Sequence, residues 1–194
     1  TQKSLLEGVR HAFGIYAQLQ KTHPNLDTLD IGGGFGIPYE KKKFYTAKDV
    51  SSKMIKMLKN LSDKAGIKHP NLVVEWGQYI VAPAEVTIYK VLSEKIIPKA
   101  NAKAWYVIDG SFMNDLKDTW AIHQKWHVIP ANNMRGALKT TWLAGSTCDS
   151  DDKYTAGGNY ILLPKLRENQ DQFIAILDTG AYQDGLSSHH CLLS

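Results

Sequence analysis

The stretch Leu29-Asp30-Ile31-Gly32-Gly33-Gly34-Phe35-Gly36 is the strongest indication of the fold. The apolar run over residues 26–31 predicts a buried β-strand, and the glycines follow at its carboxyl end. Residues without a Cβ allow positive φ and let backbone N–H groups approach a ligand, for which phosphate is the usual choice. The spacing is neither G-x-G-x-x-G nor a P-loop, so a tight βα turn without a ligand stays an open alternative.

The sequence around this stretch predicts a parallel α/β layer. Apolar spacing predicts amphipathic helices over residues 3–20 and 48–66, and a second buried strand runs over 72–75 to end at Glu75. The order is helix, strand, helix, strand, and active sites of parallel α/β folds lie at the carboxyl ends of the strands. Glu75 is therefore either a surface charge at a strand end or a site residue.

The pattern changes after residue 84. Short β-like runs separated by polar or glycine-containing turns predict a mostly antiparallel β domain over residues 85–194, after an α/β part over residues 1–84. The predicted strands of this second part cover 86–94, 104–108, 126–129, 137–143, 160–164 and 173–177.

Composition and charge exclude several classes of protein. The chain has 194 residues, 43% of them hydrophobic, which is enough for a real core, and its net charge of +4 is dispersed except at Lys41-Lys42-Lys43. We therefore expect no nucleic-acid partner. No run approaches the ~18–20 apolar residues that span a bilayer, and no signal peptide opens the chain, so no membrane association is expected. Two cysteines without a metal-site spacing indicate no metal and a reducing, cytoplasmic location.

Two further segments carry candidate site residues. Cys148-Asp149-Ser150-Asp151-Asp152 has the composition of a loop, in which the thiol is either inert or able to act as an acid or nucleophile. Its aspartates could also suggest a Ca²⁺ loop, but the EF-hand spacing is not met. Gly180-Ala181-Tyr182-Gln183 follows a predicted strand, where a tyrosine is by default a packing or interface residue.

Taken together, these segments resemble one family. The glycine stretch, then Val74-Glu75-x-Gly77-x-Tyr79, then Cys148-Asp149-Ser150-Asp151 and Gly180-Ala181-Tyr182 occur in the order and spacing of the alanine-racemase-fold, pyridoxal-phosphate-dependent decarboxylases. Members of that family act on ornithine, arginine, diaminopimelate or carboxynorspermidine. The resemblance implies a TIM-like barrel followed by a β domain, in a homodimer with shared active sites.

The resemblance also implies roles for individual residues. The amides of Gly32, Gly33 and Gly34 would hold the phosphate of pyridoxal 5'-phosphate, together with Tyr182, and Glu75 would pair with the pyridine nitrogen. Cys148 would reach into the partner subunit's site as the proton donor. Asp149, and with a weaker match Asp118, would pair with the distal cation of the substrate.

The sequence departs from the family pattern in three ways. Gln78 stands where the family has an arginine that grips the phosphate, and Trp76 fills the usual Pro or Ser position. Gln78 loses the charge assistance of a guanidinium, so weaker cofactor binding is expected. The lysine of the Schiff base lies before Thr1 in the family, and the final strands follow Ser194. We therefore expect an inactive C-terminal fragment that carries only the last part of the barrel.

The substrate preference depends on few residues. Diaminopimelate enzymes usually carry Glu after the site cysteine, so Asp149 favours a plain cation. Three segments resemble the corresponding sequences of biosynthetic arginine decarboxylases, namely His69-Pro70-Asn71, Asp118-Thr119-Trp120 and Gly180-Ala181-Tyr182-Gln183. We therefore expect arginine as the substrate, with ornithine second, and a role in polyamine biosynthesis. The alternatives are a diaminopimelate or carboxynorspermidine decarboxylase, a catalytically inactive binding protein of the same fold, or an unrelated α/β domain.

Overall fold

The computed structural model describes residues 1–39 and 45–192, so the run Lys41-Lys42-Lys43 lies outside the described residues. The chain forms two compact units, Thr1–Gly77 and Gln78–Ser194. The division of the chain at residues 84 and 85 stays a prediction from the sequence.

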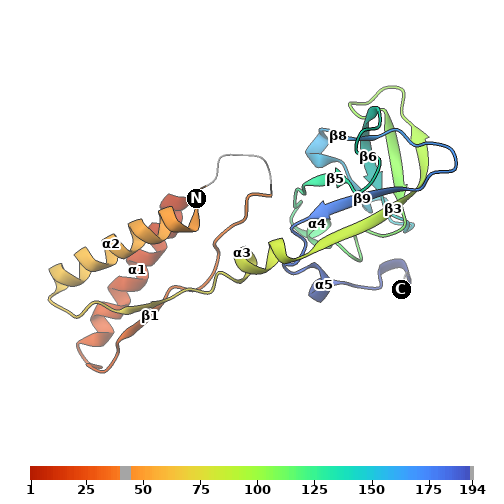
Figure 1. The fold of residues 1–194 in the computed structure, drawn as a ribbon. Helices are drawn as coiled ribbons and strands as arrows, with labels where there is room; N and C mark the ends of the chain where they lie inside the picture. Colours follow the sequence, from red (N-terminus) through yellow and green to blue (C-terminus); the bar gives the residue numbers. More distant parts are fainter. Residues whose placement is uncertain (40–44, 193–194) are drawn as a thin grey trace. The chain divides into compact units, whose positions relative to one another are not determined.

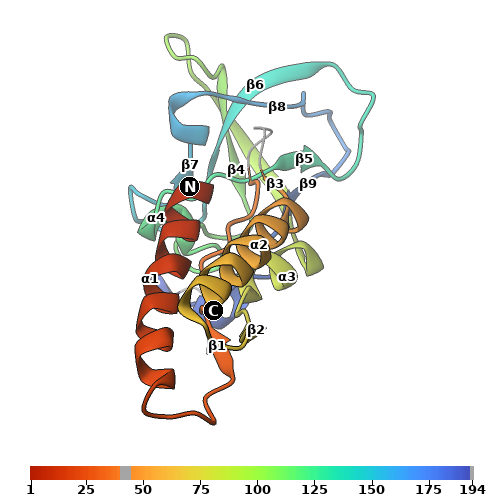
Figure 2. The ribbon, with the colours of Figure 1, turned by 90° about the vertical axis from the view of Figure 1, so that its left-hand side faces the viewer.

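The first unit is a parallel α/β layer (Figure 1). Its elements are α1 (Gln2–Gln20), β1 (Thr28–Asp30), α2 (Ala47–Ala65) and β2 (Asn71–Val73). Strands β1 and β2 pair in parallel, with Leu29 opposite Leu72, and α1 and α2 lie side by side (Figure 2). The predicted order of helix, strand, helix and strand is confirmed.

Both helices follow from their sequences. Helix α1 buries Val9, Phe13 and Tyr16, and α2 buries Val50, Met54 and Leu58 at the same spacing of three to four residues. Thr46 caps α2 in a capping box with Asp49, and Gly66 ends the helix at φ 65°, a left-handed conformation that suits glycine.

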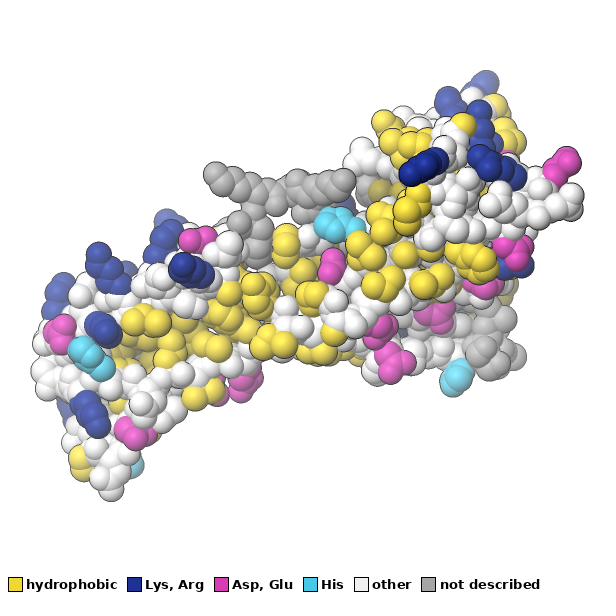
Figure 3. Space-filling view, in the orientation of Figure 1, with side chains coloured by type: hydrophobic (Ala, Val, Ile, Leu, Met, Phe, Trp, Pro, Cys, Tyr) yellow, Lys and Arg dark blue, Asp and Glu magenta, His cyan; other side chains and the backbone are white. Residues whose placement is uncertain are grey.

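The first unit exposes apolar side chains on both helices and at the end of β2. Hydrophobic side chains gather on the face of this unit drawn in Figure 3. Among the described residues, neither outer edge of the β1–β2 pair meets a further strand. A two-stranded sheet of this length needs additional cover to be stable, so this unit has the character of part of a larger layer. The exposed large hydrophobic residues of the unit are Ile15, Leu19, Ile55, Val73 and Val74.

The second unit is built on one seven-stranded sheet of order β5-β9-β3-β4-β6-β7, in which β8 pairs with β6. Among the described residues, β4 and β6 make the one parallel pairing in this otherwise antiparallel sheet, as expected for a mostly antiparallel domain. The strands are β3 (Val86–Ile96), β4 (Ala104–Ile108), β5 (Val128–Pro130), β6 (Leu138–Ala144), β7 (Lys153–Tyr154), β8 (Ile161–Pro164) and β9 (Gln172–Leu177).

The sheet curls so that β5 and β8 come into contact. The curl encloses fully buried side chains from the strands and from the segment that follows β4, among them Tyr106, Ile108, Phe112, Leu143 and Ile174. Burial raises the pKa of Tyr106 to about 12, with a smaller contribution from the charge of Glu94.

Short helices absent from the sequence prediction lie between the strands and after the last strand, β9. They are α3 (Gly77–Val81), η1 (Ala82–Ala84), α4 (Asp118–Ala121), η2 (Ala156–Gly158), α5 (Gln183–Leu186) and η3 (His190–Leu192). Such single turns are too short to show an apolar period in the sequence. Within residues 1–39 and 45–192, no helix is both long and apolar enough to cross a bilayer.

Candidate active site

The glycine loop directly follows β1. Gly32 and Gly34 have φ values of 67° and 85°, which L side chains rarely adopt. The Gly32 amide donates a hydrogen bond to Oδ1 of Asp30 at 2.8 Å. This bond closes the loop on its own strand, and the turn leaves the next two amides outside the parallel ladder.

Glu75 lies beside this loop because the strand pairing continues past β1 and β2. The Ile31 amide donates to the Val73 carbonyl at 3.2 Å, and the Glu75 amide donates to the Gly32 carbonyl at 3.0 Å. A Cβ on Gly33 would lie 2.8 Å from the Glu75 carbonyl oxygen, closer than real Cβ contacts. Gly33 is thus required by the close approach of the two strand ends.

An aromatic pair fixes the two strand ends against each other. The rings of Phe35 and Trp76 stack with centroids 4.4 Å apart at an interplanar angle of 24°, and both side chains are buried. A stacked pair of this kind adds about 0.5–1.5 kcal/mol beyond the area that it buries. Trp76, which departs from the family pattern, therefore has a structural role that the sequence did not reveal.

The site at the strand ends has the groups that an anionic cofactor needs. No described residue accepts a hydrogen bond from the amides of Gly33 or Gly34. The Glu75 side chain is exposed and has no partner among the described residues. Two available N–H groups beside a carboxylate match a ligand that carries a phosphate and a protonated ring nitrogen. The Gly32 amide, expected to join them, would first have to leave Asp30.

A second group of candidate residues lies in the loop between β6 and β7. Cys148 is exposed there, and Oδ2 of Asp149 lies 2.8 Å from Nε2 of His190. The Asp151 amide donates to Asp149 at 2.8 Å. That amide hydrogen bond, followed by the His190 ring, holds the pKa of the Asp149 carboxyl below its ordinary value. Asp149 is therefore a carboxylate across the physiological pH range.

Asp152 organises the same loop from inside. Its carboxylate is buried and accepts hydrogen bonds from the Phe112 amide at 2.7 Å and from the amide and hydroxyl of Thr147 at 3.1 and 2.7 Å. A Cβ on Gly145 would lie 2.2 Å from this carboxylate. The aspartates therefore serve the loop itself, and residues 1–39 and 45–192 contain no group of acidic, His or Cys side chains arranged to hold a metal. The sequence analysis missed the anchoring role of Asp152, for which the cluster of aspartates was the only signal.

Asp118 lies next to the tyrosine segment. Nε2 of Gln183 donates to Oδ2 of Asp118 at 2.8 Å, and the Asp118 amide donates to Oε1 of Gln183 at 3.2 Å. Gln183 is buried, whereas its neighbour Tyr182 is exposed. Asp118 and Tyr182, which are far apart in the sequence, are thus brought together in the second unit. Gln78 lies in α3 and is partly buried.

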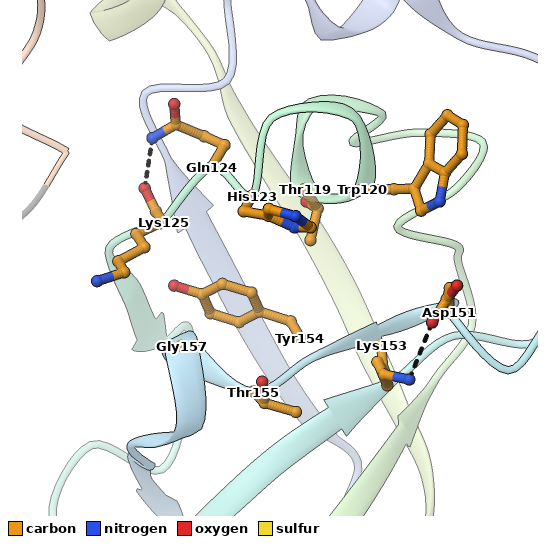
Figure 4. Close-up of a pocket in the computed structure, with 10 residues that line it drawn as sticks. All are labelled: Thr119, Trp120, His123, Gln124, Lys125, Asp151, Lys153, Tyr154, Thr155 and Gly157. Carbon is orange, nitrogen blue, oxygen red and sulfur yellow. Dashed lines mark hydrogen bonds and ion pairs between the residues drawn. The ribbon is translucent and has the colours of Figure 1, made fainter.

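Two of the cavities formed by described residues of the second unit lie near the candidate residues. One, of about 300 Å³, is lined by Tyr154 among other residues, and Lys125 and Lys153 lie on either side of the Tyr154 ring (Figure 4). None of the site residues predicted from the sequence lines that cavity, as far as the described residues go. The other, of about 290 Å³, is lined by Asp149 together with Trp105 and Lys95. Asp149 thus lines the second of these cavities, together with Ser150 and Asp152 of the same loop.

The fold of the chain matches that of solved structures. The biosynthetic arginine decarboxylase of Campylobacter jejuni matches this chain with a TM-score of 0.88 at 18% sequence identity, over 100% of this chain and 48% of that one. A partial TIM-like barrel followed by a mostly antiparallel β domain, the fold class expected from the sequence, is confirmed.

The sequence comparisons then give the family. Residues 1–82 match the pyridoxal binding domain of pyridoxal-dependent decarboxylases, and residues 44–180 match their C-terminal sheet domain. The chain belongs to the pyridoxal-dependent decarboxylases, whose cofactor is pyridoxal phosphate. The strand-end site described above fits that cofactor.

Relatives with two different substrates align with the chain. It is 28% identical to the diaminopimelate decarboxylase of Methanocaldococcus jannaschii, over 95% of this chain and 40% of that protein. It is 35% identical to the biosynthetic arginine decarboxylase of Citrifermentans bemidjiense, over 98% of this chain and 46% of that protein. The chain thus spans less than half the length of these relatives.

Proposed function

We propose that the protein is a pyridoxal-phosphate-dependent decarboxylase of a basic amino acid, with arginine favoured over ornithine, that serves polyamine biosynthesis. The observation that carries this proposal is the placement of the glycine loop against Glu75 at the ends of two paired parallel strands. The family membership of the chain gives that placement its chemical meaning.

The first unit would hold the cofactor. The Gly33 and Gly34 amides would donate to the phosphate, and the Glu75 carboxylate would accept a hydrogen bond from the pyridine nitrogen. When bound, the cofactor accepts the electron pair released as the substrate loses its carboxylate. Gln78 and Tyr182 would add neutral hydrogen bonds to the phosphate, and Gln78 contributes less than the arginine of the family.

The second unit would supply the proton and recognise the substrate. Cys148 Sγ would donate a proton to the substrate carbon that has lost its carboxylate, across a homodimer interface. Asp149, which is ionised and faces a cavity, would pair with the distal cation of the substrate. Asp118 would join it from α4, which is hydrogen-bonded to Gln183, the neighbour of Tyr182. By resemblance, the lysine that bonds the cofactor belongs to the preceding barrel strands, so residues 1–194 alone are expected to release no CO₂.

The test is CO₂ release by the full-length protein with pyridoxal phosphate and one of three substrates, namely arginine, ornithine or diaminopimelate. We expect release from arginine, with ornithine second. The Asp149→Asn variant should raise the KM for the preferred substrate about tenfold or more, because the hydrogen bond to a cation loses its charge assistance. Glu168→Gln, an exposed change in the same unit, should leave KM unchanged. Faster release from diaminopimelate would contradict the substrate assignment.

A second candidate is a catalytically inactive binding protein of the same fold, which the replacement of arginine by Gln78 favours. It predicts that the full-length protein releases no CO₂ from any of the three substrates even when the cofactor is bound. Release from any one of them excludes it.

A further inference from the structure

The two cysteines of the chain meet in the second unit. Cys148 lies in the loop between β6 and β7, and Cys191 lies in η3 near the end of the described chain. Their sulfur atoms are 3.3 Å apart although the two residues lie 43 positions apart in the sequence, and both are free thiols. A disulfide needs an S–S distance of about 2.05 Å, so a small further approach of the two sulfur atoms would let them bond.

The segment that carries Cys191 is held in place along its course. Buried Gln183 is tied to Asp118 by two hydrogen bonds, and the Ser188 amide donates to the Asn114 carbonyl at 3.2 Å. His190 then pairs with Asp149 at 2.8 Å, one residue before the cysteine. Each contact comes from a different part of the second unit, so the fold itself brings Cys191 to Cys148.

The other side of the pair is held by the same fold. The buried Asp152 carboxylate binds Thr147, which precedes Cys148, and it also binds the Phe112 amide at the start of the segment on which Ser188 rests. One carboxylate thus positions both the loop that carries Cys148 and the residues after Phe112 that contact Ser188. This common anchor limits the relative movement of the two sulfur atoms.

We propose that Cys148 and Cys191 form a reversible disulfide. This disulfide acts as a lock that holds residues 183–191 against the loop between β6 and β7. The oxidant is a low-molecular-weight disulfide such as oxidised glutathione. The Cys148 thiolate attacks it and releases one small thiol, and the Cys191 thiolate then attacks the Cys148 sulfur of the mixed disulfide and releases the second. The two protein thiols lose two electrons and two protons, and the small disulfide becomes two small thiols.

The lock acts on two groups at once. Sγ of Cys148 no longer carries a proton, and the bond to Cys191 keeps His190 on the Asp149 carboxylate. The effect on catalysis rests on the proposed function, since it needs Cys148 as proton donor and Asp149 as a substrate ligand. The formation of the disulfide depends only on the geometry of the second unit.

The first experiment maps the disulfide without any assay of activity. The purified full-length protein is incubated with oxidised glutathione, its remaining thiols are alkylated, and its peptides are identified by mass spectrometry. We expect a peptide pair that joins Cys148 to Cys191 within one chain, and dithiothreitol should restore both thiols. The Cys191→Ser variant should stop at glutathione on Cys148. A wild-type protein that also stops there, stays reduced or links two chains through Cys148 would overturn the proposal.

A second pair of variants tests whether the segment contacts matter. His190→Ala removes the contact with Asp149 and should slow disulfide formation severalfold. His11→Ala removes another exposed histidine, from α1, and should leave the rate unchanged. Equal rates in the two variants would show that the cysteines meet by chance encounter and would contradict a preformed lock.

The catalytic effect is measured separately. Oxidised wild-type protein should lose CO₂ release by about 10²-fold, the lower end of what a positioned acid contributes, and regain it with dithiothreitol. Cys191→Ser in its reduced form should retain the wild-type rate. Full activity with a mapped disulfide would contradict the lock. A protein with no activity in either state would contradict the proposed function, and the mapping would still decide the disulfide.

Discussion

Single residues determine how closely the two strand ends of the candidate site approach each other. Gly33 permits the approach of the Glu75 carbonyl, and the stack of Phe35 on Trp76 fixes that approach. The sequence indicated the glycines and the glutamate because both follow apolar runs. It could not reveal the stack, since the pairing of two aromatic residues 41 positions apart depends on the strand register.

The residue at position 78 should likewise affect the affinity for the cofactor. The Gln78→Arg variant of the full-length protein should bind pyridoxal phosphate about tenfold or more tightly, because a hydrogen bond from a cation to phosphate is stronger than a neutral one. The dissociation constant is measured by titrating the cofactor and following its absorbance. Gln18→Arg adds the same charge on the exposed face of α1 and is the control. Equal affinity of Gln78→Arg and the wild type would show that Gln78 does not reach the phosphate.

Among the elements, α2 depends on a defined cap. The Thr46 hydroxyl accepts a hydrogen bond from the Asp49 amide at 3.1 Å, and the Asp49 carboxylate accepts one from the Thr46 amide at 3.2 Å. Thr46→Ala should lower the free energy of unfolding by about 1 kcal/mol in urea denaturation. Ser52→Ala, an exposed change within the same helix, should be neutral or slightly stabilising. A Thr46→Ala protein as stable as wild type would contradict the cap.

The same cap gives stability a pH dependence. The Thr46 hydroxyl, followed by its amide, holds the pKa of Asp49 below the ordinary value of 3.8. Because the folded pKa is lower than the unfolded one, the carboxylate stabilises the fold above the unfolded pKa, and this contribution is lost as the pH falls through the folded pKa. The difference in unfolding free energy between wild type and Asp49→Asn should therefore be constant near neutral pH and shrink below about pH 4. A difference that grows on acidification would contradict this assignment.

Long elements were predictable and short ones were not. Residues 3–20 and 48–66 were expected to be helical, and the helices run over 2–20 and 47–65, because each repeats its apolar residues over several turns. Helices α3, α4 and α5 have four or five residues each and follow from contacts such as that of Gln183 with Asp118. The two-residue strand β7 exists because β6 offers it a partner, which local sequence does not encode.

At the scale of the whole molecule, the chain contains the two parts of a family fold but less than half the length of its relatives. The sequence predicted the class of both parts, since motif order survives at low identity. It could not predict that Cys191 contacts Cys148 and that His190 contacts Asp149. That meeting depends on contacts of residues 183–191 with loops far away in the sequence.

The proposed cofactor site consists of the loop after β1 and the Glu75 strand end, which together would hold pyridoxal phosphate. It is tested most directly by the dissociation constant of the cofactor from Gly33→Ala in the full-length protein. A Cβ at this position would lie 2.8 Å from the Glu75 carbonyl oxygen, so the two strand ends must separate and affinity should fall about tenfold or more. Gly8→Ala, at an exposed helix position with nothing within 4 Å, should bind as wild type does. Unchanged affinity in a folded Gly33→Ala protein would place the cofactor elsewhere.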